Sequence, residues 1–274
     1  MKGLIDFIFY RTDIARIFGW FHIASFIIVL GACIFAGIYG KKFSDKNFRK
    51  ALLIVWIVLI IGEIYRELAF GLSLDGDRYV FNYAWFVFPF QLCSSPLYAL
   101  PFVIFLPEGK IRDGFMAFLV TFSFFGGVTV MFYPGDVFYY VVGVSIQAMV
   151  HHGSQVFVGI LTVSHVKERL NRSFYLKGGA VLLGFMSVAM ILNISVYHIL
   201  RANGLSDTFN MYFISPYFPT TLPILSSIQS QGAPYPVVVL IYVCTLLLAA
   251  TLIALAQHYI VKALSERKKT KVSV

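Results

Sequence analysis

Long stretches without charged residues alternate along this chain with short segments that carry most of its charge. A helix needs about 20 apolar residues to cross a lipid bilayer. Five uncharged runs are long enough for one crossing each: 17–40, 79–107, 114–135, 137–166 and 178–200. The pattern therefore predicts a membrane-spanning helix in each of these five runs.

A sixth uncharged run, 208–261, is 54 residues long and contains five prolines, all of them before residue 237. So many prolines cannot sit in one straight helix, because each lacks an N–H group and clashes with the preceding turn. We therefore interpret 208–235 as an external proline-rich loop with re-entrant or interfacial pieces. The last helix is then expected over 236–261.

A further crossing begins at Ala51, although Glu63, Arg66 and Glu67 interrupt it, and this gives seven in total. With the N-terminus outside, 16 of the 22 Lys and Arg residues fall on the cytoplasmic side and five outside. This bias matches the positive-inside rule. The prediction is an all-α membrane protein, a seven-transmembrane-helix bundle with N-out/C-in orientation. It is one polytopic domain, 1–274, with an interfacial segment (1–16), a bundle (17–261) and a basic cytoplasmic tail (262–274).

Composition excludes a soluble protein, because 59% of residues are hydrophobic and only 13% are charged, about half the usual charged fraction. The net charge of +9 comes from basic residues scattered through connecting segments and the tail, so we expect no nucleic-acid partner. Cys33, Cys93 and Cys244 lie in separate apolar stretches without CxxC spacing. This argues against a disulfide framework or a cysteine zinc site, and we expect no metal and no cofactor.

Ionisable side chains at membrane depth are costly and need a partner or a task. Glu63, Arg66 and Glu67 are spaced by three and four residues, so they share one stripe of a helix. One interpretation is a self-neutralising ion pair that stabilises the bundle. The other is the charged wall of a polar cavity.

The run 79–107 contains Gln91 and Cys93 between Pro89 and Pro96. On an ideal helix Gln91 and Cys93 point about 200° apart, so they share a site only if the prolines distort the helix. A lone membrane cysteine is usually a small apolar filler. The case for Cys93 as a functional residue therefore depends on its neighbours.

A polar face runs along the predicted helix 137–166, where Gln147, His151 and Gln155 repeat every four residues and His152 lies about 100° away. A neutral histidine can serve only as a packed donor to a backbone carbonyl. His22, near the start of the first helix, suggests such an ordinary role.

In the predicted topology these polar residues all fall in the outer half of the membrane, which predicts a cavity open to the outer side. A thiol becomes a strong nucleophile when an imidazole takes its proton, so Cys93 with His151 or His152 is a candidate pair. Glu63 or Glu67 would orient the imidazole as the third member of a triad. Three further side chains are candidates to hold an oxyanion or a lipid phosphate: Arg66, Gln91 and Gln155. The predicted reaction is acyl transfer through a cysteine thioester that ends on water or on another lipid, so we expect a lipid acyltransferase or a lipid-ester hydrolase.

Several short motifs resemble the YwaF-type bacterial integral membrane proteins and the related animal transmembrane protein 164 family. The matching segments are Phe18–His22, Phe90–Cys93, Gly126–Gly127 with Tyr133–Asp136, His152–Gly153, Asn210–Tyr212 and Pro234–Pro236. Gln91 stands where those families have a histidine. The resemblance implies a seven-helix intramembrane enzyme, an acyltransferase acting on phospholipid or lysophospholipid. By position it implies Cys93 as nucleophile and His152 as base, and it places Asn210 in an external loop near the site.

Other functions stay open at this point. A proton- or ion-coupled transporter would use Glu63, Arg66, Glu67 and the histidines as a relay, although no inverted repeat is evident. A heptahelical receptor or assembly factor is a third hypothesis, and a metal site from His22 and the histidine pair is a variant. We expect a multi-pass protein of the cell (plasma) membrane. The acyl donor and acceptor, the choice of base and the oligomeric state are left open.

Overall fold

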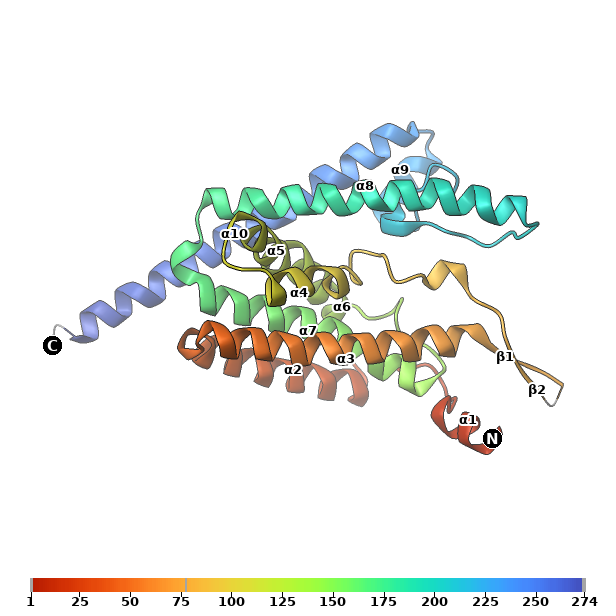
Figure 1. The fold of residues 1–274 in the computed structure, drawn as a ribbon, viewed down its shortest axis with the longest axis horizontal. Coiled ribbons are helices and arrows are strands. Elements are labelled where there is room, and N and C mark those ends of the chain that lie inside the picture. Colours follow the sequence, from red (N-terminus) through yellow and green to blue (C-terminus); the bar gives the residue numbers. More distant parts are fainter. Residues whose placement is uncertain (1, 77, 273–274) are drawn as a thin grey trace.

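The computed structural model describes residues 2–76 and 78–272 and is predominantly helical (Figure 1). Four of the described helical stretches are long and apolar enough to cross a membrane: Trp20–Lys42, Lys110–Phe132, Arg172–Ala202 and Tyr235–Ala263. The chain is therefore an integral membrane protein. Residue 1 of the predicted N-terminal segment and residues 273–274 of the predicted tail lie outside the described residues.

The helices are joined by short irregular segments and one β-hairpin. The elements of the first half are α1 (Lys2–Ile8), α2 (Trp20–Tyr39), η1 (Gly40–Lys42), α3 (Asp45–Gly71), β1 (Leu72–Asp75), β2 (Arg78–Phe81), η2 (Trp85–Val87) and α4 (Pro96–Phe105). Those of the second half are α5 (Lys110–Phe118), η3 (Leu119–Ser123), α6 (Phe124–Phe132), α7 (Val142–Val166), η4 (Lys167–Arg169), α8 (Arg172–Ala202), η5 (Met211–Phe213), α9 (Pro223–Ser230) and α10 (Tyr235–Val272). The strands β1 and β2 pair antiparallel, with Leu72 opposite Phe81.

Two helices begin in charged connecting segments, earlier than their uncharged runs. The Ser44 side chain accepts a hydrogen bond from the Asn47 N–H at the start of α3, at 3.3 Å. The Asn171 side chain does the same for the Phe174 N–H at the start of α8, at 3.0 Å. Such caps satisfy backbone donors that the first helical turn leaves free, so these helices extend beyond the apolar core of the sequence.

The run 79–107 departs most from expectation. A continuous helix over 79–107 is wrong, because β2, η2 and irregular segments occupy the run as far as Ser95, and α4 begins only at Pro96. Proline fits the first turn of a helix, where its missing N–H is not needed. Pro89 and Pro96 therefore leave Cys93 in a turn immediately before a helix rather than inside one.

The next crossing is continuous from α5 through η3 to α6, but η3 is a π-helical turn. A π turn interrupts the regular backbone ladder and leaves carbonyl groups that need other donors. Gln257 of α10 donates to the Val120 carbonyl within η3 at 2.7 Å. The irregular turn therefore ties this crossing to α10.

Helix α7 lies at the centre of the bundle and packs against α2, α3, α6 and η3, while α5 packs against α8. Figure 1 shows α2 and α3 along one side and α8 and α10 along the other, with α4, α5 and α7 between them. The contact of α5 with α8 needs a glycine, since a Cβ at Gly178 would lie 2.9 Å from the Ala117 carbonyl carbon. Fully buried residues such as Leu100, Phe118 and Phe174 fill the space between the layers.

The two ends of the bundle differ. At one end, which we call the hairpin end, lie α1 and the β1–β2 hairpin (Figure 1), and Thr12 donates to the Tyr140 carbonyl at 2.8 Å. At the other, which we call the basic end, the starts of α3 and α5 meet the end of α7, where Asp45 contacts both Arg112 and His165. The described chain thus separates two polar regions along the length of the helices.

Candidate functional site

A cavity of about 140 Å³ lies toward the hairpin end and holds most of the predicted site residues. Four parts of the chain build it: α3, the turn before α4, the segment that follows α6, and helix α7. Its lining residues are Glu63, Arg66, Phe70, Gln91, Cys93, Ser94, Asp136, Val137, Phe138, Tyr139, Val144, Gln147, Ala148, His151 and His152. We call it the Cys93 cavity. Six residues predicted to share a site therefore do so, although they come from three distant parts of the sequence.

The turn that carries Cys93 is held in place by α7. His151 Nε2 donates to the Cys93 carbonyl at 2.8 Å, and Gln155 Nε2 donates to the same carbonyl oxygen. Within the turn, the Ser94 N–H donates to the Gln91 carbonyl at 3.0 Å. The Cys93 Sγ is 4.0 Å from the Ser94 Oγ, and Ser94 is buried. The peptide at Cys93 is thus fixed while its thiol stays on the cavity wall.

Cys93 also lies close to the N-terminal end of α4, which begins three residues later. Helix N-termini present unsatisfied N–H groups and a partial positive charge, and both favour an anion. In α4, Pro96 has no N–H, and the N–H groups of Leu97, Tyr98 and Ala99 already donate to the Ser94 and Ser95 carbonyls. What favours a thiolate at Cys93, or an oxyanion beside it, is therefore the partial positive charge of the helix end alone. The prolines that stop the helix at Pro96 are what place the thiol at this end.

The two adjacent histidines have different hydrogen-bond states. His151 uses both ring nitrogens, since its Nε2 donates to the Cys93 carbonyl and its Nδ1 accepts from Gln147 Nε2 at 3.5 Å. His152 donates from Nδ1 to the Ala148 carbonyl at 2.7 Å. Its Nε2 is buried and has no hydrogen-bond partner among the described residues. His152 therefore keeps a free lone pair, whereas His151 serves to hold the Cys93 turn.

The charged residues form their own network on α3. Arg66 binds Glu63 through its Nε and Nη2 atoms, and Nη2 also lies 3.3 Å from Glu67 and donates to the Val87 carbonyl at 2.6 Å. Neither carboxylate hydrogen-bonds to a histidine in the described chain. The position expected for a carboxylate behind the imidazole is taken by the Ala148 carbonyl, because Arg66 already pairs with both glutamates. One Glu67 oxygen, Oε2, is buried and unpartnered within the described residues.

Asp136 is a cavity residue that sequence reasoning did not select. It is exposed and lines the cavity from the segment after α6. Together with Glu63 and Glu67 it makes three carboxyl groups in or beside the cavity, whereas Arg66 is the one guanidinium group among the described residues that line the cavity. Its only sequence signal is its place in a Pro-Gly-Asp turn at the end of an apolar run, and such a turn is typical of any helix connection.

Gln91 serves a different purpose from the one expected, because both ends of its amide are used by a buried loop, 209–215. Its Nε2 donates to the Asn210 carbonyl at 2.8 Å, and its Oε1 accepts the Tyr212 N–H at 2.7 Å. The Asn210 side chain accepts the Ser215 N–H at 2.8 Å, within the same loop. Asn210 does not line the Cys93 cavity; it shapes the loop that Gln91 anchors.

This loop is strained, which the sequence did not indicate. Tyr212 and Phe213 both adopt positive φ, at 56° and 57°, a conformation that is costly for bulky residues. The strain is held by Asn193 of α8, which donates to the Met211 carbonyl at 3.0 Å and accepts the Met211 N–H at 2.7 Å. The loop is thus fixed from two sides, by Asn193 and by Gln91.

His22 lies away from the Cys93 cavity. Its Nε2 is 2.8 Å from the Met131 carbonyl, and its Nδ1 accepts the Phe18 N–H at 3.0 Å. Both nitrogens are used, so His22 ties the start of α2 to the end of α6. Among the described residues no group of three or more His, Cys, Asp or Glu side chains is placed to hold a metal, and the variant site that joined His22 to the histidine pair is not assembled.

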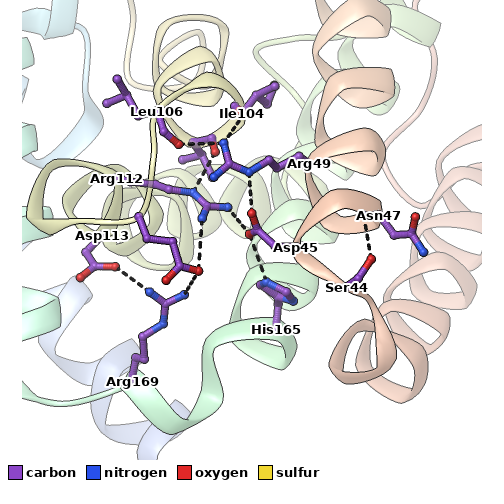
Figure 2. Close-up of polar contacts among 12 residues, drawn as sticks. Ser44, Asp45, Asn47, Arg49, Ile104, Leu106, Arg112, Asp113, His165 and Arg169 are labelled. Carbon is purple, nitrogen blue, oxygen red and sulfur yellow. Dashed lines mark hydrogen bonds and ion pairs between the residues drawn. The ribbon is translucent and has the colours of Figure 1, made fainter.

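A second polar cluster lies at the basic end, and Figure 2 shows its contacts. Arg112 is 1% exposed, lies 2.5 Å from Asp45 and donates to the Val103 carbonyl at 3.0 Å. Arg49 binds Asp45 at 2.6 Å and donates to the carbonyls of Ile104 and Leu106 at the end of α4. We call this group the Asp45 cluster; it also includes Glu108, Asp113, His165 and Arg169.

Asp45 lies at the start of α3, outside the apolar part of that helix. Partial burial alone would raise the pKa of its carboxyl group. The hydrogen bonds and positive charges of Arg112 and Arg49 outweigh that effect, so the pKa of Asp45 is below its ordinary value. The carboxylate is thus kept ionised and joins α3 to α4 and α5.

The fold and the cavity together define a class: a helical integral membrane protein with a buried cysteine–histidine cavity between its helices. Comparison with protein families gives the particular assignment. The model of the TMEM164 family matches residues 17–255, so the chain belongs to the TMEM164 family. No curated protein and no solved structure matches the chain.

Proposed function

We propose that the protein is an intramembrane lipid acyltransferase or lipid-ester hydrolase with Cys93 as nucleophile and His152 as base. The observation that carries the proposal is the unpartnered Nε2 of buried His152 in the cavity that Cys93 also lines. A buried imidazole nitrogen without a partner is costly, and such costs are typical of sites that handle protons. The adjacent His151 offers no such nitrogen, which favours His152 of the two.

The reaction has two steps. First, the Cys93 thiol gives its proton to His152 Nε2, and Sγ attacks the ester carbonyl carbon of a phospholipid. The bond from that carbon to the glycerol oxygen breaks, and the oxygen takes the proton from His152. The acyl group remains on Cys93 as a thioester, and a lysophospholipid leaves.

In the second step, water or the hydroxyl of a second lysophospholipid gives its proton to His152 and attacks the thioester carbon. The carbon–sulfur bond breaks, and the sulfur regains the proton. Water yields a free fatty acid, and a lysophospholipid yields a new phospholipid. The Ser94 hydroxyl, buried 4.0 Å from Sγ, and the N-terminal end of α4 are the groups best placed to stabilise the oxyanion in both steps.

The proposed setting is the plasma membrane, with seven crossings formed by α2, α3, α4 with its preceding turn, the α5–α6 stretch, α7, α8 and α10. The hairpin end faces outside and the basic end faces the cytoplasm. The 203–234 segment, with η5 and α9, is then external. Phospholipids enter the Cys93 cavity sideways from the outer leaflet.

The test uses purified protein in phosphatidylcholine vesicles with a radiolabelled acyl chain. We expect label on the protein that hydroxylamine releases, since hydroxylamine cleaves thioesters, and we expect none on Cys93→Ala. Cys33→Ala and Cys244→Ala are matched controls, because those thiols lie in α2 and α10 away from the Cys93 cavity. Equal labelling of Cys93→Ala and the wild type would remove the proposal.

A proton- or ion-coupled transporter is the second candidate, and the unpartnered Glu67 Oε2 favours it. A buried carboxylate oxygen without a partner is a natural proton carrier in a membrane. Proton-coupled uptake into proteoliposomes that is lost in Glu67→Gln, together with no acylation of Cys93, would decide for transport.

A further inference from the structure

Two apolar grooves flank α3, one on each side. The first, of about 520 Å³, lies between α3 and α4 and is lined by Trp56, Ile60, Glu63, Ile64, Leu97, Tyr98, Pro101 and Phe102. The second, of about 390 Å³, lies mainly between α3 and α7 and is lined by Ile8, Val58, Leu59, Ile61, Gly62, Tyr65, Gly143, Ile146, Gln147, Val150 and His151. We call them the α3–α4 groove and the α3–α7 groove.

Each groove adjoins the Cys93 cavity, with which it shares polar wall residues. The α3–α4 groove shares Glu63 with the cavity, and the α3–α7 groove shares Gln147 and His151. Away from these junctions the walls are almost entirely apolar and are exposed at the side of the bundle, where Ile64 is 57% exposed and Ile61 62%. An apolar groove at the side of the bundle that adjoins a polar cavity suits an amphiphile with a long hydrocarbon chain and a polar ester at one end.

We infer that each groove holds one acyl chain, with the transferred chain in the α3–α4 groove and the retained chain of the lysophospholipid in the α3–α7 groove. This inference rests on the proposed function and names how its two lipid substrates are bound. A lysophospholipid held in the second groove would present its hydroxyl for the transfer branch of the second step.

The assignment of the grooves follows from their neighbours. Leu97 and Tyr98 follow Cys93 by four and five residues, so the α3–α4 groove begins at the turn that carries the thiol. An acyl chain bonded to Sγ therefore finds this groove first. The α3–α7 groove instead ends at His151, whose ring centroid is 5.4 Å from that of His152. The acceptor hydroxyl must reach His152 Nε2, so a lysophospholipid enters beside it.

The junction of the second groove depends on a glycine. A Cβ at Gly62 would lie 3.1 Å from the Gln147 Cγ, so the absence of a side chain keeps α3 close to α7 without displacing Gln147. Gln147 in turn donates to His151 Nδ1. The groove wall is therefore coupled to the hydrogen bond that fixes the Cys93 turn.

The experiment compares three substitutions on α3 of the full-length protein in vesicles. Ile60→Trp fills the α3–α4 groove, Ile61→Trp fills the α3–α7 groove, and Ile57→Trp is the control. Ile57 is 46% exposed on the same helix and lines neither groove. Two rates are measured for each: formation of the Cys93 thioester from the single-chain ester p-nitrophenyl palmitate, and transfer of the acyl group to lysophosphatidylcholine.

We expect Ile60→Trp to lower thioester formation at least about tenfold, because the indole ring occupies the volume in which the acyl chain would bind, and binding of such remote substrate parts contributes to the rate. Ile61→Trp is expected to lower transfer at least about tenfold more than it lowers thioester formation. Ile57→Trp is expected to change both rates less than about twofold. Equal effects of Ile60→Trp and Ile61→Trp on the two rates would overturn the assignment, as would no effect of either.

A second measurement does not depend on catalysis. Phosphatidylcholine with a diazirine on one acyl chain is photo-cross-linked to the Cys93→Ala variant, and the labelled peptides are mapped. Labels on α3, α4 and α7 residues of both grooves support the inference, and labels confined to other surfaces overturn it. If both grooves are labelled but the wild type forms no thioester, the grooves hold lipid and the acyl-transfer chemistry is what fails.

Discussion

The Cys93 cavity and the Asp45 cluster both place arginine beside carboxylates, partly exposed Arg66 in the first and buried Arg112 in the second, but they differ in which groups they leave without a partner. In the Asp45 cluster, the guanidinium groups of Arg49 and Arg112 donate hydrogen bonds to Asp45 and to carbonyls at the end of α4 (Figure 2). One Arg112 nitrogen, Nη1, is buried without a hydrogen-bond partner among the described residues, and its charge is offset by Glu108 at 3.9 Å. The cluster thereby joins the ends of several helices.

At the Cys93 cavity, of about 140 Å³, the lining residue His152 has an unpartnered Nε2 among the described residues. Two more buried oxygens without a partner, Glu67 Oε2 and Gln155 Oε1, belong to residues that contact the lining residues Arg66 and Cys93. A satisfied polar cluster mainly rigidifies a fold. Free acid and base groups beside an open volume are what chemistry requires. The comparison therefore separates a structural region at the basic end from a reactive one toward the hairpin end, and each can be tested against the other.

The largest effect on the acylation rate is expected for substitutions of the two adjacent histidines. They distinguish the proposed base, His152, from His151, which holds the Cys93 turn. His152→Ala should lower the rate of thioester formation by about 10²–10⁴, the usual contribution of a general base. His151→Ala leaves Nε2 of His152 in place and removes one of two donors to the Cys93 carbonyl. The rate of thioester formation should therefore fall at least about tenfold less than in His152→Ala. The measurement is single-turnover acylation by p-nitrophenyl palmitate.

If His151→Ala proves as damaging as His152→Ala, the division of roles drawn from their hydrogen bonds is wrong. A pH profile adds a second readout. Protonation of a catalytic imidazole lowers the rate on acidification, and His152→Ala should abolish that dependence of the acylation rate on pH. His151→Ala should keep it.

A substitution in the Asp45 cluster should disturb the structural region and leave the Cys93 cavity intact. Arg112→Met removes the donors to Asp45 and to the Val103 carbonyl, so we expect a loss of about 1–3 kcal/mol of stability and a fall of several degrees in Tm. The rate of acylation per folded molecule should stay within about twofold of the wild type. Thermal unfolding in detergent and active-site titration measure the two quantities.

Arg169→Met is the matched control at the basic end. Arg169 is 39% exposed and lies 3.3 Å from Asp113, and exposed ion pairs contribute about 0–1 kcal/mol. Its Tm should therefore fall much less than that of Arg112→Met. Equal losses in the two variants would mean that burial of Arg112 does not give it a special role.

The smallest effect concerns pH. The pKa of Asp45 is lowered in the folded protein, so its contribution to stability is present above the pKa of the unfolded chain, about 3.9. That contribution is lost as the pH falls through the lower, folded value. Asp45→Asn should lower Tm modestly at pH 7 and reduce the further loss of Tm on acidification below about pH 5. An unchanged acid profile in Asp45→Asn would assign the acid sensitivity to other carboxylates.

Much of the helical architecture could be predicted from the chain itself. Uncharged runs located α2, α8 and α10, because an apolar helix longer than a bilayer is hard to place elsewhere. The four-residue spacing of Gln147, His151 and Gln155 correctly indicated one polar face of α7. Two of these side chains, His151 and Gln155, do bind the Cys93 turn together.

The run before α4 could not be predicted in the same way. This run is as hydrophobic as a membrane-spanning helix, but Pro89 and Pro96 divide it. Hydropathy depends on side chains only and does not show where a backbone N–H group is missing. Asp136 and the loop around Tyr212 were missed for a related reason. Both acquire their place from residues far along the chain, such as Gln91, which lies 121 positions from Tyr212.

The sequence alone determined the uncharged apolar stretches and the set of polar side chains that are costly in lipid; the orientation that it predicts from the basic residues stays a prediction. The tertiary structure decided which of those side chains have their hydrogen-bonding atoms paired and which keep an unpaired atom. His151 and His152 are neighbours with the same intrinsic chemistry, yet one meets the Cys93 carbonyl and the other meets no partner for its Nε2. Hydrogen-bond satisfaction depends on positions in space, and a periodic pattern along the chain describes only one helix at a time.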